Sequence, residues 1–273
     1  MIRVSSYFKY IPFLFLKHHF CDGKEPEIRI PQKTRQKLII CYLLDMERQK
    51  AGIIEETLEK ELSKEAQVVY AEIIKKPEIL EAFAILDQLP GELHYHNKTH
   101  TEDVIREAIL FALADGASRE TIEQQAVAAA WHDVGFIKEY QKNEPIAVEL
   151  FKQSEAYKTL SEEAREEVIA NILDTQIVVE GGIPSMSHER SSNRYILDAD
   201  VSNFGRDDFF VNRKKIADEL KIDLSDPAAK KGFYSFALDL LKNHKWETNS
   251  ARMLRQAKKD ENLRKAEEEF ASL

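Results

Sequence analysis

The sequence predicts an all-α protein, and three observations support this fold class. Helix-forming residues dominate, with only 9 Gly and 8 Pro among 273 residues, which favours helices over many-turned sheets. Apolar residues recur at three- and four-residue steps over long stretches, as on the buried face of a helix. No stretch shows the alternation that is typical of strands. The length is sufficient for one large domain with a substantial core.

The helical domain is expected to span residues 31–273, after an N-terminal extension formed by the first 30 residues. The apolar run at 7–16 is interrupted by Lys9 and Pro12, and it is shorter than the roughly 20 residues that cross a bilayer. No small-residue cleavage site follows it. We therefore expect an extension packed on the domain or on a partner, without stable membrane insertion. A weak surface anchor or a leader segment is the alternative.

Periodicity and capping residues predict the individual helices. Asn97 and Ser118 are expected N-caps, and Pro145 suits the first turn of a helix that Asn143 opens. Gly135 is expected to end or bend the helix before it, and Gly181-Gly182 with Pro184 is expected to be a loop. The other expected helices cover 32–50, 53–76, 78–89, 97–114, 161–173, 189–204 and 248–272, with one or two more before the last.

Charge and cysteine content restrict the function. A net charge of −9 argues against non-specific binding to nucleic acid, which needs a positive surface. It leaves a small phosphorylated substrate open, because a bound cation would reverse the local field. Cys21 and Cys41 have no metal-type spacing, so we expect no disulfide framework and a cytoplasmic location. The sequence leaves a homo-oligomer open.

Four residues with metal-ligand side chains recur in the order His, His-Asp, Asp. They are His100, His132, Asp133 and Asp200, separated by helical stretches. The His-Asp pair ends an alanine-rich helix, whose small side chains allow neighbouring helices to approach closely. A buried Asp beside a buried His is costly unless it is paired or bound to a metal.

Helical spacing distinguishes Asp200 from the nearby Asp198. On a helix, positions 196, 197, 200, 201 and 204 share one face, which is apolar except for Asp200. Asp200 is therefore expected to point inward. Asp198 is expected either at the surface or behind a metal-ligating residue, touching that residue but not the metal.

His96 lies four residues before His100, about one helical turn away. This separation can place one imidazole on a metal and the other beside a bound substrate. A proton donor in that place is what departure of a leaving group requires.

These motifs resemble those of the HD-domain metal-dependent phosphohydrolases. The resemblance covers roughly residues 92–205, and Tyr95-His96-Asn97 with His100 is similar to the motif of cyclic-nucleotide phosphodiesterases and some bacterial relatives. It implies that His100, His132, Asp133 and Asp200 ligate one or two divalent metal ions (Mg, Mn, Zn, Fe, Ni or Co), with Asp133 as the bridge between two ions. It further implies that His96 is the general acid in the hydrolysis of a phosphoester by metal-activated water, and the expected substrate is nucleotide-like.

The chain also departs from the family pattern. Val134-Gly135-Phe136-Ile137 replaces the further Asp and the His-Pro-Gly stretch of the cyclic-nucleotide enzymes, and Phe136 stands where other bacterial members have a Lys. The substrate is therefore left open. One alternative is a nucleotide-binding regulatory module with a degenerate site. Another is a di-iron oxygenase, which needs extra His ligands such as His188.

Three further positions carry two interpretations each. Glu144 either reaches the site through a water or stabilises the first turn of its helix. His188 is either a ligand of a second ion or an exposed loop residue. Asp174-Thr175 either lines the pocket or caps its helix. Trp131 is expected to pack in the core beneath the site.

Overall fold

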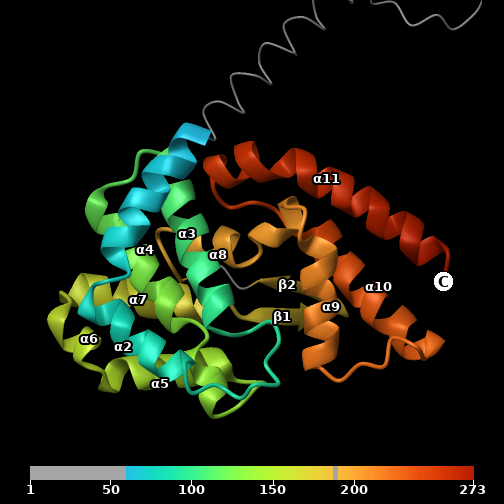
Figure 1. The fold of residues 1–273 in the computed structure, drawn as a ribbon, viewed down its shortest axis with the longest axis horizontal. Coiled ribbons are helices and arrows are strands. Elements are labelled where there is room, and N and C mark those ends of the chain that lie inside the picture. The colour runs from blue at the N-terminus through green and yellow to red at the C-terminus, as the bar shows by residue number, and fades with distance from the viewer. Residues whose placement is uncertain (1–59, 187–189) are drawn as a thin grey trace, which may run out of the picture. The chain divides into compact units, whose positions relative to one another are not determined.

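A computed structural model describes residues 60–186 and 190–273, and confirms the all-α class (Figure 1). These residues belong to one compact unit, Ile54–Leu273. The expected extension, the helix at 32–50 and His188 lie outside the described residues. Among the described helices, none is both long and apolar enough to cross a membrane.

Helices account for nearly all the elements. The first described helix covers 60–73. It is followed by α2 (Pro77–Leu86), α3 (Lys98–Ala114), α4 (Arg119–Trp131), the 3-10 helix η2 (Val134–Ile137), α5 (Asn143–Gln153), α6 (Glu155–Thr159), α7 (Glu162–Asp174), β1 (Ile177–Glu180), β2 (Ile183–Met186), α8 (Tyr195–Asp200), the 3-10 helix η3 (Ser202–Gly205), α9 (Phe209–Glu219), α10 (Pro227–Asn243) and α11 (Asn249–Ala271).

The predicted N-caps are confirmed. The side chain of Asn97 accepts hydrogen bonds from the backbone N–H groups of Thr99 and His100 at the start of α3. The Ser118 side chain accepts one from Thr121 at the start of α4. Each bond satisfies a backbone donor that has no partner within the helix. The beginning of α3, which carries His100, is thereby fixed by its own sequence.

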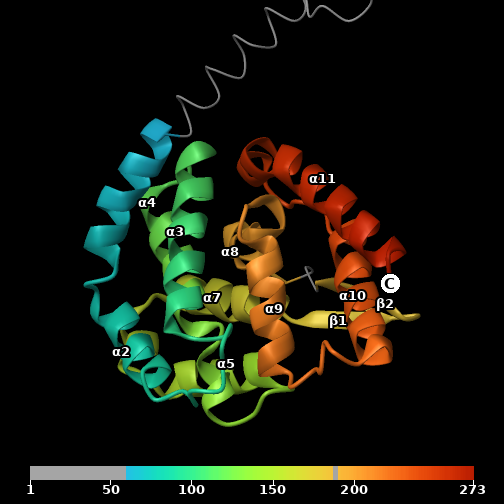
Figure 2. The same cartoon turned by 45° about the vertical axis from the view of Figure 1, so that its right-hand side comes forward.

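Helix α4 forms the centre of the core. It packs against α2, α3, α7 and α8, and Figures 1 and 2 show it surrounded by them. This close approach is possible because Ala126, Ala128, Ala129 and Ala130 are fully buried. Trp131 is also fully buried, and its Nε1–H donates to the carbonyl of Glu78 at 3.0 Å. The expected core role of Trp131 is confirmed.

The C-terminal helices pack along η3 and reach back to α3. Helix α11 contacts η3, α10 and α3, and Figure 2 shows α9, α10 and α11 grouped together. A Cβ on Gly205 would overlap the backbone of Arg255, so only glycine allows this approach. Arg255 donates two hydrogen bonds, of 3.0 and 2.9 Å, to the carboxylate of Glu107 on α3. Helix α11 thus braces the helix that carries His100.

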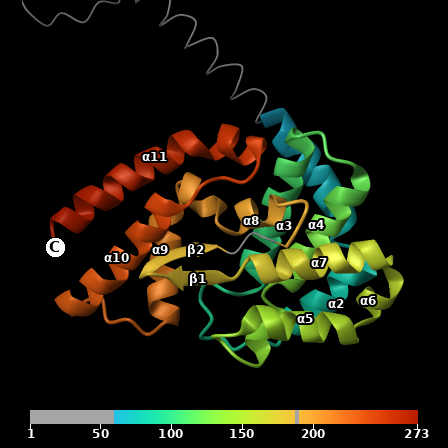
Figure 3. The same ribbon diagram turned by 180° about the vertical axis from the view of Figure 1, so that it is seen from behind.

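A β-hairpin occupies the stretch that we expected to be a loop. Strands β1 and β2 pair antiparallel, with Glu180 opposite Ile183, and Gly181 and Gly182 both have positive φ, of 58° and 86°. Two such residues are what the tightest hairpin turns require. The strands are too short for alternation to be visible in the sequence. The hairpin runs from the end of α7 to α10, which β2 contacts (Figure 3).

The helix expected at 189–204 is shorter. It begins only at Tyr195 and ends at Asp200, and η3 follows. The preceding backbone is held by carboxylates instead. Asp174 accepts the N–H groups of Arg190 and Ser191, and Glu167 accepts those of the next two residues. Side-chain acceptors of this kind compete with helix formation.

Candidate metal centre

Three helix ends bring His100, His132, Asp133 and Asp200 together, and we call these four residues the His–Asp cluster. His100 lies in the first turn of α3, His132 and Asp133 follow α4 directly, and Asp200 ends α8. His100 Nε2 is 3.0 Å from Asp200 Oδ1 and 3.6 Å from Asp133 Oδ2. His132 Nε2 is 3.1 Å from Asp133 Oδ2 and 3.5 Å from Asp200 Oδ1. The four predicted ligands therefore converge.

The donor atoms of the cluster suit a cation. One atom each from His100, His132 and Asp200 lie within 4.8 Å of one another. His132 Nδ1 donates to the carbonyl of Ala129 at 2.7 Å, which directs its Nε2 toward the carboxylates, an arrangement common among metal-binding histidines. His132 Nε2 and Asp133 Oδ2 are buried and form no hydrogen bond with any described residue. Buried polar atoms are rarely left unsatisfied, and a metal ion would satisfy both.

The charges within the cluster also favour a bound cation. Burial disfavours a charged imidazole, yet Asp133 and Asp200 raise the pKa of His132 well above its usual value. Burial also opposes ionisation of Asp200, but the two histidines lower its pKa. A histidine that ligates a metal must be a neutral imidazole, so a bound ion would take the place of the proton on His132, and the two carboxylates would then carry a charge of about −2. One divalent ion would balance it.

Asp198 is buried, which corrects the expectation of a surface residue. It points away from the cluster, as the helical spacing predicted, but its exposed fraction is 0%. Its carboxylate accepts the backbone N–H groups of Glu247 and Thr248 and the hydroxyl of Thr248, at 2.6 to 2.8 Å. These donors precede α11, which lies far along the chain, so spacing within α8 could not reveal them. Asp198 joins the end of α8 to the start of α11.

His96 is held by Glu219, a residue that sequence reasoning missed. His96 Nδ1 is 2.5 Å from Glu219 Oε1. The backbone N–H groups of Tyr95 and His96 donate to Glu219 Oε2 at 2.8 and 3.0 Å, and the hydroxyl of Tyr140 donates to Oε1 at 2.8 Å. Glu219 ends α9, 123 residues after His96. No local motif marks it, because the contact depends on how α9 docks.

The His96–Glu219 pair has a defined charge state. Burial opposes the imidazolium, but the hydrogen bond to Glu219 and the charges of Asp133 and Glu219 raise the pKa of His96. Burial alone would raise the pKa of Glu219, but its bonds to His96, Tyr95 and Tyr140 lower it to about 2. Glu219 is therefore a carboxylate at neutral pH, and its hydrogen bond and charge favour the protonated form of His96. The other ring nitrogen, Nε2, forms no hydrogen bond with a described residue.

Phe136 stacks on the imidazole of His96. Their ring centroids are 4.6 Å apart and the planes are inclined by 26°. An apolar ring thus lies against the imidazole of His96, at the position where the family that the sequence resembles is expected to have a Lys. Glycine immediately before it is required, because a Cβ on Gly135 would overlap the backbone of Asn143 on α5.

A cavity of about 400 Å³ opens beside the cluster and has two unlike walls. Its lining includes five polar residues that we call the polar wall: His96, His132, Asp133, Glu144 and Asp200. It also includes five apolar residues from η3, α9 and α10 that we call the apolar wall: Phe204, Phe209, Phe233, Phe236 and Leu240. Three exposed apolar residues, Ile177, Leu220 and Phe236, also line this cavity.

The positions with two interpretations resolve in part. Glu144 lines the cavity, and burial together with Asp133 and Asp200 raises its pKa. Thr175 lines it as well, whereas Asp174 accepts the backbone of the segment after the hairpin. His188 lies outside the described residues.

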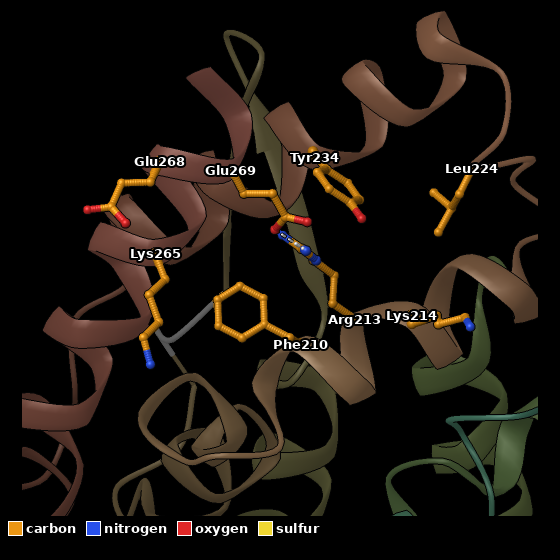
Figure 4. A pocket seen from close by; sticks show the side chains of 8 residues that line it. All are labelled: Phe210, Arg213, Lys214, Leu224, Tyr234, Lys265, Glu268 and Glu269. Atoms are coloured by element: carbon orange, nitrogen blue, oxygen red, sulfur yellow. Dashed lines mark hydrogen bonds and ion pairs between the residues drawn. The ribbon is translucent and has the colours of Figure 1, made fainter. Parts of the chain in front are cut away.

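A second hollow lies away from the cluster, between α9, α10 and α11 (Figure 4). Its side chains include Arg213, which stacks 3.9 Å over the ring of Tyr234 and pairs with Glu269 at 2.5 Å. Arg213 also lines the cavity beside the cluster. The Arg213 side chain therefore lies between the two hollows and lines both.

Comparisons with known proteins add no relative: no family model, no curated protein and no solved structure matches this chain.

Proposed function

We propose that this protein is a metal-dependent phosphohydrolase of the HD-domain type, acting on a small, nucleotide-like phosphoester. The single observation that carries the proposal is the His–Asp cluster. Four ligand-type side chains converge from three helix ends, and two of their buried atoms form no hydrogen bond with any described residue. Beside them stands a histidine whose charge and orientation are set by a carboxylate.

The cluster would hold one or two divalent ions through His100, His132, Asp133 and Asp200. Such an ion supplies a Lewis acid that polarises a phosphoryl oxygen and activates water. The protein's own residues supply the rest. Glu219 keeps the Nδ1 proton of His96 in place, so that Nε2 can deliver a proton to the departing oxygen. Phe136 limits the movement of the His96 ring through stacking.

The test combines metal content with turnover. The purified chain is analysed for metals and assayed on cyclic nucleotides, nucleoside mono- and triphosphates and simple phosphodiesters, with Mg, Mn, Zn, Fe, Ni or Co. We expect bound metal and hydrolysis, both abolished by Asp133→Ala. The control is Asp207→Ala, because Asp207 is 93% exposed and its one ion pair within the described residues is with Lys258.

Three results would contradict the proposal. One is no turnover of any phosphoester with any of the metals. Tight nucleotide binding without turnover would favour the regulatory module instead. Two bound irons with oxygen consumption would favour the di-iron oxygenase.

A further inference from the structure

A third hollow, of about 400 Å³, lies where the end of α10 meets α11. Among the described residues, it shares no lining residue with the cavity beside the His–Asp cluster. Its lining includes Lys242, Lys245, Arg252 and Lys259, against the single acid Asp260. We call its ten lining residues the basic pocket: Leu241, Lys242, His244, Lys245, Trp246, Arg252, Gln256, Lys259, Asp260 and Leu263. Its charge is opposite to that of the polar wall, where Asp133, Glu144 and Asp200 gather.

Most of this positive charge is not neutralised by the described part of the chain. Lys242 pairs with Glu267 at 2.9 Å. Lys245 and Arg252 are exposed and form no ion pair with a described residue. Two cations beside the hollow are therefore available to a ligand.

Lys259 is the cation with the greatest need of a counter-ion, because it is buried, with an exposed fraction of 5%. Its ammonium donates to the carbonyl of His244 at 2.5 Å and lies 5.7 Å from the ring centroid of Trp246. No described carboxylate lies within ion-pair distance of it. Burial lowers the pKa of Lys259 to about 8, and Asp260 and Asp198 only partly offset this effect. A buried charge without a counter-ion is costly, so an anion here would stabilise the ammonium.

The indole of Trp246 provides a second, independent observation. Trp246 is 4% exposed and lines the basic pocket. Its Nε1–H is buried and forms no hydrogen bond with any described residue. A buried indole N–H usually has an acceptor. An ammonium without a counter-ion and a donor without an acceptor thus line the same hollow.

We propose that the basic pocket binds a phosphate-bearing small anion. A phosphate group carries several acceptor oxygens and more than one negative charge, so it can engage a lysine, an arginine and a neutral N–H together. Lys259 and Trp246 lie in the interior, and Lys245 and Arg252 stand at the exposed side. This inference does not rest on the proposed hydrolytic function.

The test is calorimetric titration of the full chain with inorganic phosphate, pyrophosphate and a nucleoside monophosphate, together with tryptophan fluorescence. We expect saturable binding of one ligand and a change in emission that Trp246→Phe removes. Binding should persist in Asp133→Ala, because the basic pocket lies apart from the cluster. The three ligands distinguish a free phosphate from a nucleotide as the source of the group.

Charge variants locate the site. Lys259→Met keeps the apolar stem, and Arg252→Gln removes an exposed cation; each should weaken binding about tenfold or more. Lys258→Met is the matched control, because the neighbouring Lys258 pairs with Asp207 and Glu261 outside the pocket; it should change affinity by less than about twofold. If Lys259→Met does not fold, as judged by circular dichroism, Arg252→Gln decides alone.

Absence of saturable binding would overturn the proposal. Equal weakening by Lys258→Met would do so too, since it would indicate a general effect of net charge. Equal affinity for sulfate would overturn the preference for phosphate.

Discussion

The two walls of the cavity differ in how their residues are arranged along the chain. On the polar wall, His132 and Asp133 are neighbours in sequence, and His96 stands about one helical turn before His100, a member of the His–Asp cluster. On the apolar wall, Phe204, Phe209, Phe233 and Phe236 come from η3, α9 and α10 and belong to no recognisable motif. The difference teaches that the polar wall is marked by local sequence patterns, whereas the apolar wall depends on how the C-terminal helices pack.

The largest expected effect comes from disturbing the backbone under the polar wall. Gly135→Ala forces a Cβ into the backbone of Asn143, and we expect it to lower the free energy of unfolding by at least about 3 kcal/mol. Gly232→Ala in α10, beside the apolar wall, meets no atom within 4 Å and should raise it by up to about 1 kcal/mol. Urea denaturation measures both. Similar changes in the free energy of unfolding for the two variants would show that the two walls tolerate an added Cβ equally well.

The second prediction separates the proton donor from the metal ligands. Glu219→Gln should lower kcat about 10²-fold or more while metal content stays unchanged. Because Glu219 raises the pKa of His96, its loss should lower that pKa. The protonated acid is then lost at lower pH, so the basic limb of the profile of kcat/KM should move to lower pH. An unshifted limb with lost activity would mean that Glu219 is only structural.

The third prediction concerns the apolar wall. Phe236→Ala should raise KM about tenfold for 2-phenylethyl phosphate, because the ring loses an apolar contact, and leave KM for ethyl phosphate nearly unchanged. Both esters have primary alcohol leaving groups, so the chemistry is matched. Val211→Ala on α9 is the control, since Val211 is 59% exposed and does not line the cavity. A fall in kcat for both esters would assign Phe236 to the chemistry instead.

The smallest effect is expected on the hairpin. Ile177 lines the cavity and is 44% exposed, whereas Val179, two residues along the same strand, is 57% exposed and does not line it. Ile177→Ser should raise KM for the phenylethyl ester by roughly threefold, in keeping with a half-buried contact. Val179→Ser should leave it unchanged. Steady-state kinetics of the two variants show whether the apolar contacts with the substrate extend to strand β1.

The polar wall could be predicted from the sequence because local sequence patterns mark its residues. Asn97 caps the helix that carries His100, the alanines of α4 foretell burial of His132, and helical spacing points Asp200 inward. The apolar wall and Glu219 were out of reach for the same reason. Glu219 contacts His96, which lies 123 residues earlier, and the apolar wall is assembled from η3, α9 and α10. No short pattern encodes how such separate segments dock.

Local signals also failed where side chains compete with the backbone. The helix expected from 189 begins at Tyr195 because Asp174 and Glu167 take the backbone donors before it. The buried Asp198 looked like a surface residue because its donors, Glu247 and Thr248, are in the loop before α11. Each error concerns a carboxylate that is satisfied by a distant segment.

The link between Asp198 and the start of α11 has a consequence for biosynthesis. All four members of the His–Asp cluster are translated before α11, but a domain generally folds as a unit. Until α11 docks, Asp198 lacks its donors and Glu107 lacks Arg255. We expect the nascent chain to hold its ligands but not their final geometry. We therefore expect the proposed metal binding to follow the docking of α11, a helix that carries no member of the His–Asp cluster.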